Sequence, residues 1–323
     1  MQLIRGLQNY PASNGCVATI GNFDGVHRGH RAIFARLAEV GKQQNLPLCA
    51  ITFEPLPHEF FRPDDGVMRL STLRDKTCAI ASCGIDQLLL MHFNQQLAGL
   101  QAQEFIDEAL LSTLKVRHLV VGDDFRFGNQ RRGDFAMLQA AGKQHGFGVE
   151  SFNTVVSNAI PAADTATATR ISSSAIRQAL TAHDFTQAAQ LIGHPYSISG
   201  RVIKGQQLAR QLGHPTANVC LKNFRPGIRG VFAVTLTHDG GLSESQSTTY
   251  QGVANLGERP TVDGKRLLLE VHVFDAEPDL YDSVVNVGFH HYLRGEKKFD
   301  GLDQLKQAIA NDADAARAYF AAA

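Results

Sequence analysis

The first half of the chain alternates short apolar runs with longer stretches of helical periodicity, and this alternation limits the folds open to it. The apolar runs are CVATIG, PLCAITF, QLLLMHF, RHLVVG and GFGVESF. Two intervening stretches, HRGHRAIFARLAEVG and AQEFIDEALLSTLK, repeat apolar residues on one helical face, and Gly41 is expected to end the first helix. Strands that alternate with helices form parallel βαβ units with right-handed crossovers. The pattern therefore predicts a doubly wound α/β domain.

The pattern changes after Pro195. Six β-rich runs follow: YSISGRVIKG, PTANVCL, GVFAVTLTH, TTYQGVANLG, KRLLLEVHVFD and SVVNVGFHHYL. An amphipathic stretch, GLDQLKQAIANDADAARAYF, follows them. Closure removes exposed strand edges, so we expect a small six-stranded antiparallel β-barrel with a C-terminal helix. Because 323 residues exceed what one hydrophobic core usually supports, we expect two domains, 1–182 and 183–323, with the boundary in residues 182–196.

Charge and composition argue against several classes of protein. Lys+Arg and Asp+Glu both number 31, so no global positive field favours nucleic acid or an anionic membrane. No run approaches the roughly 18 apolar residues of a membrane span, and MQLIRGLQNYP lacks the apolar core of a secretory leader. The five cysteines form no C-x-x-C pair, which suits buried free thiols. We expect a cytoplasmic protein without nucleic-acid or membrane partners, and the sequence leaves a homo-oligomer open.

The segment GNFDGVHRGH follows the first predicted strand, at the end of the strand where open parallel sheets bind their ligands. Gly21, Gly25 and Gly29 let the backbone approach a ligand, and the N-terminus of the following helix attracts an anion. His27 and His30 are expected on one helical face, from which both can donate to one phosphate group. The spacing is neither that of a P-loop nor that of a dinucleotide-binding turn. A phosphate cradle is favoured over an ordinary turn.

Two later segments could contribute to a nucleotide site. In VGDDFRFGNQRRGD, Phe125 and Phe127 could pack a planar ring, and Asp124 could accept hydrogen bonds from a base or a ribose. The alternative for this segment is a hairpin-like loop with solvated arginines. In RISSSAIR, the serines beside Arg170 and Arg177 either cap a helix or surround a polyphosphate with hydroxyl, N–H and guanidinium groups.

Two features of the β-rich half could carry chemistry. In PTANV, strand alternation points Thr216 and Asn218 the same way, and a hydroxyl and an amide oxygen suit Mg²⁺. The alternative is an unremarkable strand start. Glu270 is the only carboxylate inside an apolar strand, which costs free energy unless it is partnered or used. The alternative is a glutamate on an edge strand that faces water.

Seven segments resemble, in order, the motifs of the bacterial bifunctional riboflavin kinase/FAD synthetase family: GNFDGVHRGH, TFEPLP, VGDDFRFG, RISSSAIR, LGHPTANV, GVANLGERPT and LEVHVFD. The resemblance runs from about residue 15 to the C-terminus. It implies a transferase with two activities: ATP-dependent phosphorylation of riboflavin to FMN, and adenylyl transfer from ATP to FMN, giving FAD and pyrophosphate. Mg²⁺ is the implied cofactor, and ATP, riboflavin, FMN and FAD are the implied substrates or products.

The resemblance makes the first half a nucleotidyltransferase domain, in which His27 and His30 would be catalytic residues on the ATP phosphates. Asp124 and Phe125 would lie near the substrates. The residues implied to line the nucleotide are Gly21, Asn22, Phe23 and Asp24. Those implied to hold the polyphosphate are Arg170, Ser173, Ser174 and Arg177. The family often has threonine where Ser174 stands, and the hydroxyl is kept.

For the barrel, the resemblance implies that Glu270 is the general base that accepts the proton of the ribityl 5′-hydroxyl. Thr216 and Asn218 would bind the Mg²⁺ that bridges the nucleotide phosphates. Because a hydroxyl is a poor nucleophile until its proton has an acceptor, these roles give a glutamate in an apolar strand a reason to be there.

The chain departs from the family most in the barrel. Ala209 and Asp282 stand where many members have glycine, and His214 stands where they have phenylalanine. These departures motivate an alternative: an FMN adenylyltransferase whose barrel only binds flavin as a regulatory module. A third hypothesis is a nucleotidyltransferase for another phosphorylated alcohol, with a barrel that reads nucleic acid. The zero net charge argues against this third hypothesis.

Overall fold

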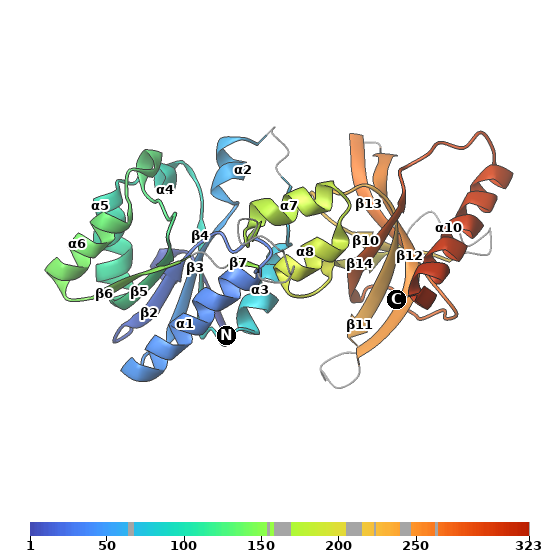
Figure 1. Cartoon of the computed structure of the whole chain (residues 1–323). Coiled ribbons are helices and arrows are strands. Elements are labelled where there is room, and N and C mark those ends of the chain that lie inside the picture. The colour runs from blue at the N-terminus through green and yellow to red at the C-terminus, as the bar shows by residue number, and fades with distance from the viewer. Residues whose placement is uncertain are drawn as a thin grey trace. The chain divides into compact units, whose positions relative to one another are not determined.

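The structure is a computed structural model of the chain (Figure 1). It describes residues 1–63, 68–153, 156–157, 169–204, 215–222, 224–239, 247–261 and 264–322. Two compact units divide the chain: Met1–Val67 with Lys76–Ser173, and Met68–Asp75 with Ser174–Ala323. The domain boundary expected after residue 182 stays a prediction.

A six-stranded parallel sheet forms the centre of the first unit, with strand order β1-β4-β3-β2-β5-β6. Its strands are β1 (Gln2–Arg5), β2 (Cys16–Ile20), β3 (Leu48–Glu54), β4 (Gln87–His92), β5 (Val116–Gly122) and β6 (Gly148–Phe152). From β2 the chain moves outward through β3 and β4 on one side, and from β5 to β6 on the other. The predicted doubly wound sheet is confirmed, and its strand order reverses between β2 and β5.

Helices cover both faces of this sheet (Figure 1). They are α1 (Arg28–Gln44), α2 (Pro57–Phe61), α3 (Leu73–Ala81), α4 (Gln95–Gly99), α5 (Ala102–Phe105), the π-helical η2 (Ile106–Thr113) and α6 (Phe135–His145). Short elements complete the unit: η1 (Leu7–Asn9), η3 (Asn129–Arg131), and the paired β7 (Val156–Ser157) and β8 (Thr169–Arg170). Strand alternation supplies both cores: Ala18 packs with the cluster under η2, and its neighbour Val17 with the cluster under α1.

The prediction that Gly41 ends the first helix is wrong. α1 continues to Gln44, and Asn45 ends it in the left-handed conformation, with φ 53°. Gly41 is buried inside the helix, where a Cβ would run into the side chain of Leu48. The glycine is therefore explained by the close approach of α1 to β3.

The second unit contains a closed antiparallel barrel with strand order β10-β13-β12-β11-β14-β9. Its strands are β9 (Tyr196–Ile203), β10 (Ala217–Cys220), β11 (Gly230–Asp239), β12 (Ser247–Thr261), β13 (Gly264–Val273) and β14 (Val284–Arg294). α7 (Ser173–Thr181) and α8 (Phe185–Ile192) precede the barrel, and α10 (Leu302–Ala322) packs on β11, β12 and β14. The predicted six-stranded barrel with its C-terminal helix is confirmed.

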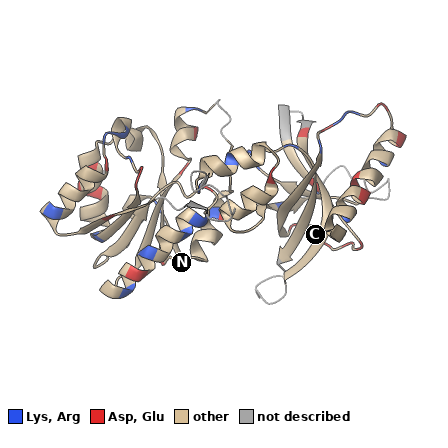
Figure 2. Ribbon diagram, in the orientation of Figure 1, with Lys and Arg blue, Asp and Glu red and all other residues tan. Residues whose placement is uncertain are grey.

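Charged residues of both signs are interspersed along the helices that the structure describes. Figure 2 shows charged residues of both signs on α1 and on α10. This mixture agrees with the equal numbers of the two signs in the sequence. Any site for an anion must therefore be built from locally arranged groups.

Candidate functional site

The loop between β2 and α1 carries most of the residues expected to line a nucleotide. It leaves the carboxyl end of β2 beside β5, where the strand order reverses and where open α/β sheets bind ligands. Phe23 and Val26 have positive φ angles of 46° and 36°, and Gly25 has φ 81°. Such a backbone is strained for residues with a Cβ and concentrates at functional sites. The buried side chains of Phe23 and Val26 hold it in place.

The first residues of this loop pack tightly. The Phe23 side chain is 1% exposed and contacts the rings of His30 and Phe34, so only its backbone can face a nucleotide. A Cβ on Gly21 would lie 3.0 Å from the Phe23 ring, which makes glycine the residue that fits there. A nucleotide at this loop could therefore meet these two positions only through their backbone.

Carbonyl groups of the loop are tied to its neighbours. Asn22 is exposed, and its carbonyl oxygen accepts a hydrogen bond from Thr52 Oγ1 at 3.1 Å. The carbonyl oxygen of the buried Asp24 accepts from Ser173 Oγ at 3.1 Å. Two elements far apart in sequence therefore fix the course of the loop, and Ser173 uses its hydroxyl on the loop backbone.

His27 is the N-cap of α1. Its Nδ1 accepts a hydrogen bond from the backbone N–H of His30 at 3.3 Å, so the neutral ring carries its proton on Nε2. The two imidazole rings stack, with centroids 3.6 Å apart and planes 18° apart. The histidines lie together as expected, but through a cap and a stack, because His27 precedes the first helical residue.

His30 is held neutral by its surroundings. Burial, with His27 and Lys76 as neighbouring charges, holds the pKa of His30 well below 6.5. Its Nδ1 is buried and has no hydrogen-bond partner in the part of the chain that the structure describes. Lys76 on α3 is fully buried. Near neutral pH His30 therefore carries no full positive charge.

The absence of a side chain at Gly29 leaves space for the imidazole ring of His27. A Cβ at this position would lie 3.1 Å from Cε1 and Nδ1 of His27 and 3.4 Å from the carbonyl oxygen of Ile171. Ile171 therefore lies close to the start of α1, and glycine lets the histidine ring lie against the helix.

The loop after β5 meets Arg170. Nη2 of this arginine contacts Asp124 Oδ2 at 3.0 Å and Asp123 Oδ1 at 3.3 Å. All three side chains are largely exposed, so the pairs contribute little to stability. Arg170 and Asp124, which we expect in one nucleotide site, therefore lie together. In this structure the Arg170 guanidinium pairs with carboxylates.

The rings of the same loop have different environments. Phe127 is buried, packs against Phe105, and its backbone pairs with Gly133 in both directions. Phe125 is half-buried and stacks on Phe127, with centroids 5.6 Å apart. The hairpin-like alternative describes the backbone, and Phe125 is the ring that remains partly open for a planar ligand.

Ser174 and Arg177 belong to the second unit, on α7. Nε of Arg177 donates to the carbonyl oxygen of Met68 at 2.7 Å, and both residues lie in that unit. Ser173 is the last residue of the first unit. The expected polyphosphate residues are thus divided between the compact units.

The barrel places Glu270 in the middle of a polar row. β13 lies between β10 and β12, and Glu270 is directly opposite Asn218 on one side and Asn255 on the other. Residues directly opposite in antiparallel strands project from the same face. The adjacent row, Val219, Leu269 and Leu256, is fully buried inside the barrel. Glu270 is not on an edge strand, because the barrel is closed.

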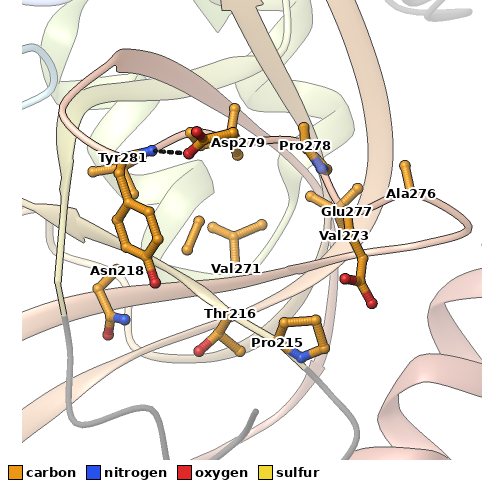
Figure 3. Close-up of a pocket in the computed structure, with 13 residues that line it drawn as sticks. Pro215, Thr216, Asn218, Val271, Val273, Ala276, Glu277, Pro278, Asp279 and Tyr281 are labelled. Atoms are coloured by element: carbon orange, nitrogen blue, oxygen red, sulfur yellow. Dashed lines mark hydrogen bonds between the residues drawn. The ribbon is translucent and has the colours of Figure 1, made fainter.

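Thr216 and Asn218 line a cavity of about 360 Å³ (Figure 3). The other lining residues are Val202, Pro215, Ala217, Val271, Val273, Ala276, Glu277, Pro278, Asp279, Leu280 and Tyr281. Within the described residues no group of three or more His, Cys, Asp or Glu is arranged to hold a metal. A hydroxyl and an amide oxygen fit Mg²⁺ only if nucleotide oxygens and water complete its shell.

The departures from the family differ in their position. Asp282 lies in a turn with φ 59°, and its N–H donates to the carbonyl oxygen of Val202 at 3.1 Å. The carbonyl oxygen of Asp282 accepts a hydrogen bond from the Arg201 side chain. This left-handed conformation explains the glycine of other members, and aspartate is one of the residues that tolerate it. Ala209 and His214 lie outside the described residues.

Sequence reasoning missed three residues of these sites. Asp123 shares Arg170 with Asp124, Asn255 lies opposite Glu270, and His272 contacts the carbonyl oxygen of Pro215 through Nδ1 at 3.0 Å. His272 could have been found from the sequence, because alternation within LEVHVF places it on the same face of the strand as Glu270. No local signal predicts which residue of another strand lies opposite.

Two family models match the chain. The one described as FAD synthetase matches residues 10–166, and the one described as riboflavin kinase matches residues 192–320. Bifunctional riboflavin kinase/FMN adenylyltransferase of Pseudomonas fluorescens is 49% identical over 323 residues, covering 99% of this chain and 98% of its own length. The protein of that description from Escherichia coli (strain K12) is 45% identical over 322 residues, with the same coverage.

A solved structure shares the arrangement of elements. The crystal structure of a macrolide-efflux protein from Streptococcus pneumoniae superposes with a TM-score of 0.77, at 26% identity and 98% coverage of each chain. Among the helices that the structure describes, none has the length and apolar character needed to cross a membrane.

Proposed function

Because this chain belongs to the bifunctional riboflavin kinase/FMN adenylyltransferase family, we propose that it phosphorylates riboflavin to FMN in the barrel and adenylylates FMN at the loop between β2 and α1. The observation that carries this proposal is the presence of two separate polar sites, one in each compact unit. One is the stacked histidine pair at the start of α1, and the other is the row around Glu270.

In the adenylyl transfer, an oxygen of the FMN phosphate attacks the α-phosphorus of ATP. The new bond joins that oxygen to phosphorus, and the bond to pyrophosphate breaks. Catalysis then rests on alignment and on neutralising the charge of the leaving pyrophosphate. The Nε2–H of His27 and the backbone N–H groups at the start of α1 supply donors for it.

The neutral state of His30 supports this assignment. A neutral imidazole keeps one donor and one acceptor, whereas a protonated one beside His27 and the buried Lys76 would add like charges. We therefore assign the histidine pair to orientation and hydrogen bonding, and the attraction of the polyphosphate to the helix N-terminus and to Arg170.

In the kinase step, the ribityl 5′-hydroxyl attacks the γ-phosphorus of ATP, and ADP leaves. Glu270 accepts the hydroxyl proton. Thr216 and Asn218 would hold Mg²⁺, which would neutralise negative charge on the phosphates. The arrangement of Asn218 directly opposite Glu270 supports a single site for metal and base.

The cavity beside Thr216 has the size of a nucleoside site. Carboxylates of Glu277 and Asp279 also line it (Figure 3), and they repel phosphate. We therefore assign the phosphates to Thr216 and Asn218, and a base or sugar to the rest of the cavity.

Product analysis of two full-length variants tests the division of labour. With riboflavin and Mg-ATP, His27→Ala is expected to stop at FMN, while Glu270→Gln should make no FMN from riboflavin but should convert supplied FMN to FAD. Both changes should reduce their own step by at least about a hundredfold. Loss of both activities in either folded variant contradicts the two-site assignment.

The alternative of a regulatory barrel has a specific outcome in the same experiment. If the wild-type chain makes FAD from FMN but no FMN from riboflavin, the barrel only binds flavin. Asp282 no longer favours this alternative, because its turn keeps the left-handed backbone that glycine would provide. A cytoplasmic location and a homo-oligomeric state stay predictions.

A further inference from the structure

We propose that Asn255 is a positioning residue for Glu270, an inference that rests on the proposed role of Glu270 as the kinase base. Asn255 on β12 and Asn218 on β10 lie directly opposite Glu270 from its two sides. Side chains so paired have Cβ atoms about 4.5–5.5 Å apart and share a face. The carboxylate therefore projects between two amides.

The chemistry of the row gives each amide a different task. An ionised carboxylate only accepts hydrogen bonds, and an amide NH₂ group donates two. Asn218 is buried and borders the cavity that would hold the nucleotide, so its oxygen is the one proposed for the metal. Asn255 is half-buried on the far side of Glu270 and has no such assignment. Its NH₂ group is placed to hold one carboxylate oxygen and so to direct the other toward the substrate hydroxyl.

The charges around the row explain why a neutral donor suits this position. His272 follows Glu270 by two residues on β13, and Cys220 follows Asn218 by two on β10. The carboxylate of Glu296 lies over Gly257, which follows Asn255 by two on β12, since a Cβ there would run into it. Asn255 thus stands between the positions of two carboxylates, where a neutral donor adds no further negative charge.

A purely structural role makes a different prediction. Val253, two residues before Asn255, packs with Ala313 and Ala316 of α10. If Asn255 only supports this packing, its replacement changes stability and leaves the chemistry of Glu270 unaltered. The pH dependence of the kinase step separates the two roles.

The test uses the full-length chain, with kcat and KM for FMN formation followed from pH 5 to 9. Asn255→Ala should lower kcat about tenfold with little change in KM, and should move the acidic limb of kcat to higher pH. Asn255→Asp, of nearly the same shape, should move that limb further. Adenylylation of supplied FMN reports on folding in each variant. Asn286→Ala is the matched control: this strand asparagine donates to Ser197 and Ser199 and should leave kcat and the limb unchanged.

Each outcome decides the matter. Unchanged kcat and an unchanged acidic limb in both Asn255 variants overturn the proposal, as does a rise in KM alone. If Asn255→Ala does not fold, Asn255→Asp carries the test through its pH profile. Glu270→Gln separates failure of the proposed function from failure of this inference. If Glu270→Gln keeps FMN formation, the proposed base is wrong. If it abolishes FMN formation while the Asn255 variants behave as wild type, only the positioning role of Asn255 fails.

Discussion

His27 serves two purposes with the two nitrogens of one ring. Nδ1 caps α1 by accepting the N–H of His30, and this fixes the proton on Nε2. The stack on His30 then limits rotation of the ring. An aspartate at this position could also cap the helix but would offer no donor. In the proposed site, the spacing of the two histidines therefore couples the start of the helix to the geometry of the phosphate contact.

Gly29 allows a prediction that separates stability from activity. Gly29→Ala should stabilise α1 slightly through helix propensity, yet its Cβ would press on the His27 ring from 3.1 Å. We expect conversion of FMN to FAD to fall about tenfold or more, because displacement of a positioning group by a fraction of an ångström is costly. FMN formation should not change, and both rates can be measured on one preparation.

Gly99 provides the matched control. It lies at the end of α4 in the same unit, and a Cβ there would meet no atom within 4 Å. Gly99→Ala should leave both activities intact. Equal loss of FAD formation in the two variants would show that the effect does not come from His27.

At the scale of elements, α10 is joined to the barrel by a bidentate ion pair. Arg294 at the end of β14 contacts Asp312 through Nε at 2.8 Å and Nη2 at 2.7 Å, and the Asp312 side chain is 12% exposed. Asp312→Ala should lower the free energy of unfolding by about 2 kcal/mol, because it leaves a partly buried guanidinium without its partner. Chemical denaturation measures the loss.

The same helix supplies a comparison of equal geometry. Arg317 and Asp275 also pair bidentately, at 2.8 and 2.9 Å, but the Asp275 side chain is 77% exposed. Asp275→Ala should cost much less, and added salt should reduce its effect further. Equal losses in the two variants would mean that burial does not set the strength of these pairs.

The helices and strands also show how much of the fold could be predicted from the sequence. The parallel strands and the six barrel strands were predictable because their apolar residues repeat with a clear period. β1 was missed: it has four residues, and Ile4 alone is buried. Gly41 was misread because a glycine that admits a neighbouring strand and one that ends a helix look alike in sequence.

For the candidate sites, only contacts between residues of one motif were predictable from the sequence. Residues within one motif, such as His27 and His30, could be paired from their spacing. Contacts between distant segments could not: the ion pair of Arg170 with Asp123, and the register that sets Asn255 against Glu270, depend on how strands align.

At the scale of the molecule, one buried histidine should make stability sensitive to acid. A histidine whose pKa is lowered in the folded state favours unfolding once the pH falls below its unfolded value, since the unfolded chain then binds the extra proton. Titration of His30 therefore leaves stability unchanged above about pH 6.5 and should lower it by up to about 1.4 kcal/mol per pH unit below that.

Unfolding followed between pH 5 and 8 tests this expectation. His30→Gln should flatten the loss of stability below pH 6.5, whereas His145→Gln, at an exposed position at the end of α6, should retain it. Because His30 is itself assigned to adenylyl transfer, unfolding is followed by circular dichroism in all three proteins and not by activity. An equal pH slope in wild type and His30→Gln would contradict this account.

The alternation of β13 has a consequence for how such a chain can change over time. Leu269 faces the packed interior of the barrel, while its neighbour Glu270 faces the polar row. Side chains at alternate positions of one strand thus have different roles, one set in packing and the other in the proposed chemistry. Substitutions at packed interior positions could adapt the stability of the barrel to heat or cold while the catalytic row is kept. Substitutions in the row could equally change the chemistry while the packed core of the barrel stays the same.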